Sequence, residues 1–212
     1  MRGRSAVVDG DERGAGAGAA SAAGPRRKDV RRNQQNLLDA AAAVFFASGV
    51  EAPVRDIAAE AGVGVATVYR HFPTRADLII AVYRHQVDAC AEAGPALLAS
   101  SPSAHAALGR WVDLFVGFLV TKHGLAGAMR TDGAGFEALH AYFLDRLLPV
   151  CAALLDAATA AGEIRADIDA YQLMRGVGNL CIGAENDPRY DARRAVALLV
   201  AGLARPDRGG AS

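Results

Sequence analysis

Residues 54–72 read VRDIAAEAGVGVATVYRHF, and this stretch decides how the N-terminal part of the chain folds. Its first half places apolar residues on one face at helical spacing: Val54, Ile57, Ala58 and Ala61. Gly62 then stands where a helix ends and the backbone needs a positive φ. A second inner stripe follows at i, i+3 and i+7, made of Val65, Val68 and Phe72. The pattern predicts two short helices joined by a tight turn, a geometry that places one helix in the major groove of DNA.

The other face of the second helix is polar. It carries a hydroxyl, a guanidinium and an imidazole at i, i+3 and i+4, from Thr67, Arg70 and His71, and no carboxylate. These groups donate hydrogen bonds to base edges and phosphates. A polar face is also typical of any solvated helix, so periodicity alone leaves both interpretations open.

A family resemblance favours the DNA-binding interpretation. The segments Ile57-Ala58-x-x-Ala61-Gly62-Val63 and Thr67-Val68-Tyr69-Arg70-His71-Phe72 resemble the DNA-binding signature of the TetR-type bacterial repressors. The similarity continues into Pro73-Thr74-Arg75-x-Asp77-Leu78, where that family begins its fourth helix, and it covers roughly residues 30–83. It implies an all-α protein with an N-terminal three-helix helix-turn-helix DNA-binding domain and a larger helical ligand-binding and dimerisation domain.

The resemblance also implies which residues meet DNA. Thr67 matches a position at the start of the recognition helix, Tyr69 and His71 match common phosphate contacts, and Arg75 matches a cation that also contacts phosphate. The expected set is Arg32, Arg55, Gly64, Val65, Thr67, Tyr69, Arg70, His71 and Arg75. For Arg32 and Arg55, contact and plain solvation are equally compatible with the sequence. Gly64 departs from the family, in which many members have a serine that caps this helix, and Val65-Ala66 replaces a commoner small or polar pair.

Charge is balanced overall but unevenly placed. The chain has 23 basic and 23 acidic residues, which argues against a protein that coats nucleic acid indiscriminately. Residues 26–32 hold five cations and one anion, a run typical of a solvated tail or of an arm that meets phosphates. Residues 1–25 are rich in Gly and Ala without the apolar core of a signal peptide, and we expect a disordered tail there. No apolar run approaches the roughly 18 residues that span a bilayer, so no membrane partner is expected.

The remaining sequence predicts helices and no strand with clean alternation. We expect helices over about residues 30–48, from Thr74 to before Gly94-Pro95, from Ser103 through Leu119, 125–130, 135–161, 168–183 and 191–204. Gly49 and Gly162 end two of them, and Thr74 with Asp77 resembles a capping box. The predicted division is a tail at 1–25, the helix-turn-helix domain at 26–75, the effector-binding and dimerisation domain at 76–206, and a tail at 207–212.

The family resemblance implies a cavity for a small effector among the later helices. Three aromatic residues recur at i, i+4 and i+7, and other large or polar residues are plausible neighbours. The candidate lining is Trp111, Phe115, Phe118, Met129, Phe136, Tyr142, Met174 and Asn179. An aromatic stripe at this spacing is typical of ordinary core as well, so both interpretations stay open here.

The last two helices suggest an assembly surface. Residues 195–203 are apolar nearly all round, and a helix without a polar face is either central core or a partner surface. With the family resemblance we favour a twofold homodimer formed by four helices, two from each chain. The expected interface residues are Val177, Leu180, Val196, Leu199, Val200 and Leu203.

The leading interpretation is a ligand-responsive, cytoplasmic transcriptional repressor, associated with the nucleoid when bound to DNA. Its expected partners are a double-stranded palindromic operator, a small-molecule effector and a second copy of the chain. A helical enzyme using His140 with Asp145, or Glu163 with Asp167, and a helical scaffold are the alternatives. Neither carboxylate arrangement has the geometry of a catalytic pair. The three widely spaced cysteines have no metal-ligand spacing, and we expect reduced thiols, no metal and no cofactor.

Overall fold

The computed structural model describes residues 23–128, 133–165, 167–182, 187 and 189–205. Within these ranges the chain forms eight α-helices and no strand, which confirms the all-α prediction. The helices are α1 (Ala23–Ser48), α2 (Val54–Glu60), α3 (Val65–His71), α4 (Arg75–Ser100), α5 (Ala104–Ala128), α6 (Gly133–Ala160), α7 (Ala170–Cys181) and α8 (Ala192–Ala201). Helix α1 begins seven residues before the expected Val30. Of the tail predicted at residues 1–25, residues 23–25 belong to α1, and residues 1–22 lie outside the described residues, as does the tail predicted at residues 207–212.

The helix-turn-helix forms as the sequence predicts. Gly62 has φ +65° after α2, and Gly49 has φ +79° after α1, so both helices end in the left-handed conformation that glycine adopts without strain. Pro53 stands at the N-cap of α2. At the start of α4, the Thr74 hydroxyl accepts a hydrogen bond from the backbone N–H of Asp77, and the Asp77 carboxylate accepts one from the backbone N–H of Thr74. This is the capping box expected from the sequence.

The core of this region comes from apolar stripes on successive helices. The buried side chains are Leu37, Leu38, Ala41 and Phe45 of α1, Ile57 and Ala58 of α2, Val68 of α3, and Phe72. On the same helix as the buried Phe45, Phe46 is 65% exposed, because it lies one position and about 100° further round. One expectation was wrong. Val65 is also exposed, since it is the first residue of α3 and projects before the helix reaches the core.

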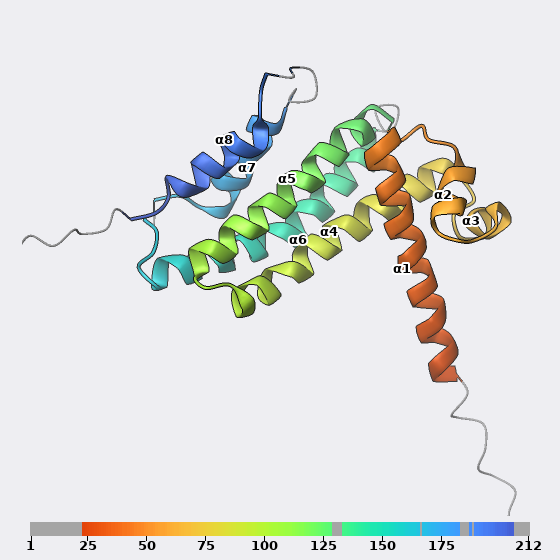
Figure 1. Ribbon diagram of the computed structural model, residues 1–212, viewed down its shortest axis with the longest axis horizontal. Coiled ribbons are helices and arrows are strands. Elements are labelled where there is room, and N and C mark those ends of the chain that lie inside the picture. The colour runs from red at the N-terminus through yellow and green to blue at the C-terminus, as the bar shows by residue number, and fades with distance from the viewer. Residues whose placement is uncertain (1–22, 129–132, 166, 183–186, 188, 206–212) are drawn as a thin grey trace, which may run out of the picture. The chain divides into compact units, whose positions relative to one another are not determined.

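Helices α4, α5 and α6 pack against one another and run side by side in Figure 1. Helices α7 and α8 contact each other, and both also contact α5. The inward residues of α4 and α5 recur at helical spacing: Leu78, Ile79, Val82, Tyr83, Val87, Leu108, Trp111, Val112, Phe115 and Leu119. Ser103 caps α5 by accepting a hydrogen bond at 3.1 Å from the backbone N–H of Ala106.

Two predicted helix ends were wrong. Helix α4 continues through Gly94 and Pro95 to Ser100 instead of ending before them. Proline removes one backbone hydrogen bond, but tertiary packing outweighs this local cost because Gly94 is buried close to Val150 of α6. Helix α5 continues through Gly124 to Ala128, so residues 125–128 are not a separate short helix. A glycine without a following proline does not by itself end a helix.

Helices α5 and α6 are the most apolar of the described helices, and α6 is the longer of the two. Its segment Glu137–Ala160 is long and apolar enough to cross a membrane by length and composition alone. Its inward side chains, Leu139, Phe143, Leu147 and Leu154, are instead buried in the helical bundle. After α6, Ile164 pairs with Ala204 in an isolated antiparallel bridge, which ties the chain after α8 to the loop before α7.

Candidate nucleic-acid interface and ligand cavity

Helix α3 buries one side and exposes the other. Val68 is buried, whereas Tyr69, Arg70 and His71 are exposed and Thr67 is half-buried. The helix begins at Gly64, which offers no side-chain cap; its carbonyl accepts a hydrogen bond at 2.8 Å from the backbone N–H of Thr67. The expected weak capping is therefore present. The seven residues of α3 present a hydroxyl, a phenol, a guanidinium and an imidazole to solvent or to a partner.

Arg75 has a role that the sequence did not predict. Its guanidinium donates hydrogen bonds to the carbonyl of Val50 and, at 2.7 Å, to the carbonyl of Ala52. It also lies over the Phe45 ring, with its Cζ 5.7 Å from the ring centroid. These contacts join the start of α4 to the loop between α1 and α2. Arg75 is therefore a tether within the helix-turn-helix region, and a phosphate contact would have to compete with these partners.

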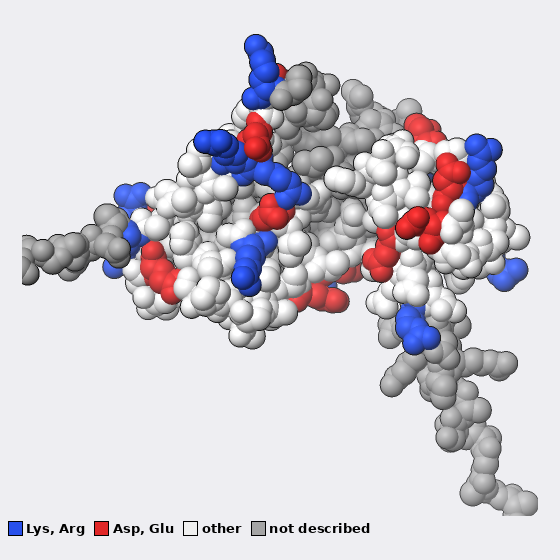
Figure 2. Space-filling view, in the orientation of Figure 1, with Lys and Arg blue, Asp and Glu red and all other residues white. Residues whose placement is uncertain are grey.

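The two arginines for which contact and solvation were equally compatible are both exposed. Arg55 on α2 has a side chain 79% exposed and pairs with the neighbouring Asp56 at 3.4 Å. Arg32 lies on α1. Figure 2 shows basic and acidic side chains interspersed on the face that it presents, in keeping with the zero net charge. A single broad basic surface is not seen on that face.

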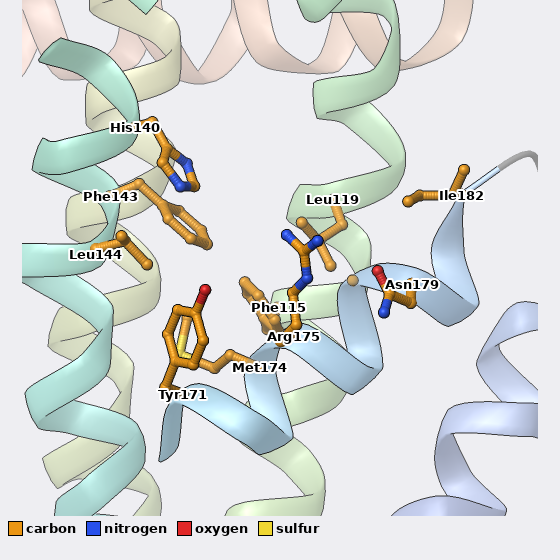
Figure 3. Close-up of a pocket in the computed structure, with 11 residues that line it drawn as sticks. Phe115, Leu119, His140, Phe143, Leu144, Tyr171, Met174, Arg175, Asn179 and Ile182 are labelled. Atoms are coloured by element: carbon orange, nitrogen blue, oxygen red, sulfur yellow. The ribbon is translucent and has the colours of Figure 1, made fainter. Parts of the chain in front are cut away.

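A cavity of about 220 Å³ lies between α5, α6 and α7 (Figure 3). Its apolar lining includes Phe115 and Leu119 from α5, Phe143 and Leu144 from α6, and Met174 from α7. Its polar lining consists of His140, Tyr171, Arg175 and Asn179, and Gly178 and Ile182 complete it. In Figure 3 the Arg175 guanidinium points into the space between His140 and Leu119.

Of the eight lining residues predicted from the sequence, three line this cavity: Phe115, Met174 and Asn179. Trp111, Phe118 and Tyr142 do not line it. Trp111 is fully buried and packs parallel to Phe115, with ring centroids 5.7 Å apart. Phe118 of α5 and Tyr142 of α6 contact residues of α4 instead. Each lies on a different face of its helix from the residues that face α7. Met129 and the Phe136 side chain lie outside the described residues.

Sequence reasoning missed most of the α7 side of the cavity, although a signal for it exists. The lining residues of α7 recur at i, i+3, i+4, i+7, i+8 and i+11: Tyr171, Met174, Arg175, Gly178, Asn179 and Ile182. This is one helical face of mixed polarity. On α6, His140, Phe143 and Leu144 share a face by the same spacing.

Aromatic and polar contacts connect the cavity with α4. The Phe143 ring lies 5.8 Å from the Phe118 ring, and Phe118 meets Tyr83 of α4 edge-on at 5.2 Å. On the next face of α6, the Tyr142 hydroxyl donates a hydrogen bond to Asp88 at 2.7 Å, and Arg146 pairs with the same carboxylate oxygen at 2.8 Å. Burial and the Asp88 hydrogen bond raise the pKa of Tyr142.

Comparisons with known proteins agree with this architecture. The profile described as "Bacterial regulatory proteins, tetR family" matches residues 37–82, and "Transcriptional regulator SbtR-like, C-terminal domain" matches residues 103–205. The crystal structure of a TetR transcriptional regulator from Streptomyces coelicolor is 36% identical, covers 82% of this chain and 99% of its own, and has a TM-score of 0.70. The chain belongs to the TetR family.

Two further TetR-type relatives support this assignment. A TetR transcription regulatory protein from Mycobacterium vanbaalenii is 31% identical over 85% of this chain and 100% of its own, with a TM-score of 0.67. An HTH-type transcriptional regulator of Staphylococcus aureus (strain USA300) is 38% identical over 63 residues, which are 29% of this chain and 34% of the relative. The chain thus spans about a third of the curated relatives it matches.

The residues expected at a TetR dimer interface divide into two groups. Val177, Val196, Val200 and Leu203 are buried within the chain itself, and Leu180 and Leu199 are half-buried. The exposed apolar side chains on α7, α8 and the segment between them are Tyr171, Ile182, Tyr190 and Leu198, of which Leu198 is 67% exposed. Sequence periodicity missed Leu198, because residues 195–203 contain too few polar residues to mark the outer face.

Two carboxylates of the enzyme alternative, Glu163 and Asp167, have structural partners in this TetR fold. The Glu163 side chain accepts a hydrogen bond at 2.7 Å from the backbone N–H of His105, at the start of α5. This hydrogen bond lowers the pKa of Glu163. Asp167 lies 3.8 Å from Arg165. Among the described residues no group of His, Cys, Asp or Glu could hold a metal ion, and all three cysteines are buried free thiols.

Proposed function

We propose that this chain is a homodimeric repressor that binds a palindromic DNA operator and releases it when a small molecule occupies the cavity between α5, α6 and α7. Residues 26–75 act as the DNA-binding domain and residues 76–206 as the effector-binding and dimerisation domain. The protein works in the cytoplasm, on the nucleoid when bound to DNA. The observation that carries the proposal is α3: a short helix after a glycine turn whose outer side holds Thr67, Tyr69, Arg70 and His71.

The polar residues of α3 have distinct roles in this proposal. Thr67, near the start of the helix, meets base edges or a thymine methyl, because hydroxyl and methyl groups suit both contacts. Tyr69, Arg70 and His71 meet phosphates or neighbouring bases, and the cations of residues 26–32 strengthen binding in a salt-dependent way. Arg75 serves chiefly to hold the loop before α2 in place.

Dimer formation supplies the second recognition helix. Two α3 helices read half-sites one helical turn apart, roughly 34–36 Å, only if the dimer fixes their separation. The exposed side chain of Leu198, with half-buried Leu199 beside it, supports this region of α8 as the dimer surface. Large apolar side chains left exposed on adjacent helices are typical of such interfaces.

The cavity lies close to contacts that reach the DNA-binding helices. A ligand against Phe143 presses on a ring that packs against Phe118, which packs against Tyr83 of α4. Helix α4 begins at Arg75, whose guanidinium holds the loop before α2. A displaced α4 would change the position of α3 relative to the partner's α3. The ligand acts only to the extent that it binds the released state more tightly than the DNA-bound state.

The experiment is a gel-shift titration with the DNA upstream of the chain's own reading frame, at several salt concentrations, followed by footprinting. We expect a discrete complex that protects a palindrome, with affinity falling as salt rises. Binding that is equal on unrelated DNA of the same length would contradict sequence-specific recognition.

A further inference from the structure

We propose that the cavity between α5, α6 and α7 takes a small amphipathic carboxylate, with the anionic head at Arg175 and the apolar body against Phe115 and Phe143. This inference rests on the proposed function, because it names the chemical class of the effector for the same cavity. The inference is argued only from the side chains of this chain that line the cavity.

Arg175 carries the argument because its solvent-exposed guanidinium has no protein partner among the described residues. It makes no hydrogen bond or ion pair with any other residue in the described part of the chain. Three other arginines of the same region are paired: Arg146 with Asp88, Arg189 with Asp187, and Arg193 with Asp113. In Figure 3 the Arg175 guanidinium nonetheless points into the cavity rather than away from it.

The charges around the cavity favour an anion. Among the described residues, the lining contains Arg175 and His140 and no Asp or Glu. Glu137, one turn before His140 on α6, is exposed and does not line the cavity. A guanidinium binds a carboxylate through two parallel N–H···O bonds, a geometry that an alcohol or an ammonium group cannot match. The Asn179 amide and the Tyr171 hydroxyl offer further donors beside Arg175.

The apolar lining of the cavity determines the kind and size of the apolar group that the ligand carries. Phe115 and Phe143 have ring centroids 5.8 Å apart and an interplanar angle of 27°, so they form a nearly continuous aromatic wall. Leu119, Leu144 and Met174 add aliphatic surface. A volume of about 220 Å³ is small for a ligand site. Since a water molecule takes about 30 Å³ of liquid, this volume equals that of about seven water molecules, which favours a small ligand.

Two other cavities in the described part of the chain lack this combination. One, between α5 and α8, is lined by Asp113 and Arg193, which already form an ion pair with each other. The other is lined by Asp39 and His85, which lie 2.7 Å apart, with α5 residues such as Phe118. In both, the charged groups that could hold a ligand are satisfied by the protein.

The test is a calorimetric titration of the full-length protein with three probes that differ in one group: phenylacetate, 2-phenylethanol and 2-phenylethylamine. Octanoate, octan-1-ol and octylamine form a second series, which distinguishes an aryl from an alkyl body. We expect each carboxylate to bind about tenfold or more tightly than its alcohol, and the amine to bind most weakly. Trp111 is the sole tryptophan and stacks on Phe115, so its fluorescence should change on binding.

Variants of Arg175 test whether this residue binds the carboxylate head group of the ligand. Arg175→Met should weaken carboxylate binding about tenfold and leave the alcohols unchanged, whereas Arg175→Lys should lose only part of the affinity, since it keeps the charge without the planar fork. Arg110→Gln removes an exposed arginine of α5 that does not line the cavity, and it should bind like the parent. Alcohols that bind as tightly as carboxylates, no binding in either series, or an Arg175→Met variant with full affinity would each overturn the proposal.

A gel shift with the same probes separates this inference from the proposed function. Arg175-dependent carboxylate binding supports the ligand class even if the DNA complex persists, and it is then the proposed release mechanism that fails. If the protein binds no operator at all, the proposed function fails while the calorimetric result still decides the ligand class.

Discussion

The indole N–H of Trp111 on α5 donates a hydrogen bond to the backbone carbonyl of Cys90 on α4, with the two atoms 2.9 Å apart. This bond lies just before Gly94-Pro95, where proline removes a backbone donor from α4. We expect Trp111→Phe to lower the free energy of unfolding by about 1–3 kcal/mol, because a buried hydrogen bond and packed ring atoms are lost. Urea unfolding followed by far-UV circular dichroism measures this. Leu114→Ala, at an exposed site on the same helix, is the control, and equal midpoints for both variants would contradict the role of Trp111.

Gly94 is predicted to tolerate no side chain. A Cβ built there lies 2.3 Å from Cγ1 of Val150, a branched side chain that has little freedom to move. Gly94→Ala should therefore destabilise the protein by about 1–3 kcal/mol. Gly178→Ala, where no atom lies within 4 Å, should instead stabilise α7 by about 0.5–1 kcal/mol. The combined change Gly94→Ala with Val150→Ala should cost less than the sum of the two single changes; simple additivity would show that no clash exists.

Two substitutions on α3 should weaken DNA binding in different ways. Thr67→Ala should cost about 1–3 kcal/mol on the operator and relax the preference at one base pair, because a base contact is lost. His71→Ala should weaken all DNA sequences alike and reduce the slope of log affinity against log salt. Gel shifts on the operator and on single-base variants measure both. If both proteins keep the parent affinity, α3 is not the recognition helix.

The dimer surface is best tested at Leu198. Leu198→Asp places a charge on the exposed side of α8 and should produce monomers in sedimentation velocity, with operator binding lost and the far-UV spectrum unchanged. Leu114→Asp is the matched control, because Leu114 is also an exposed leucine but lies on α5. Aspartate substitutions of Val196 or Val200 would not test the dimer, because both side chains are buried within the chain and the substitutions would destabilise the subunit itself. A monomeric Leu198→Asp protein that still binds the palindrome tightly would refute the dimer mechanism.

Stability should fall at alkaline pH because of two buried thiols. Burial raises the pKa of Cys90 and of Cys151 from 9.0 to about 12. The folded state therefore keeps protons that the unfolded state loses, so this contribution is complete below pH 9.0 and is lost as pH rises toward 12. Replacing both residues with Ala should flatten the fall in unfolding free energy across this range. An unchanged slope would assign the effect to other groups, such as the buried Tyr83, whose pKa is also raised.

The sequence predicted the parts of the fold that local chemistry controls. Gly62, Pro53 and the Thr74–Asp77 capping box act within a few residues, and each forms as expected. The sequence failed where distant residues decide. The path of α4 through Gly94-Pro95 depends on Val150, which lies more than fifty residues later in the chain.

The same contrast between local and distant control holds for the candidate site. Periodicity correctly grouped Trp111, Phe115 and Phe118 on α5, but it could not show which of them faces α7 and which faces α4. Arg75 matched a family position for phosphate contact, yet its partners are the carbonyls of Val50 and Ala52, which no local pattern connects with it. Arg175 was missed because a single arginine in a helix is typical of solvated surface, and its meaning depends on the cavity beside it.

The unbroken course of α4 has a mechanical consequence. Between Gly94, held against α6, and Arg75, which holds the loop before α2, the helix forms a rigid lever about 28 Å long, since each residue rises about 1.5 Å. A tilt of about 10° at the Gly94 end would therefore move the Arg75 end by about 5 Å. Successive bases of a strand are about 3.4 Å apart, so this small angle already exceeds one base-pair step. In the proposed mechanism, a ligand in a cavity of modest size therefore needs only a small movement of α4 to change the position of α3.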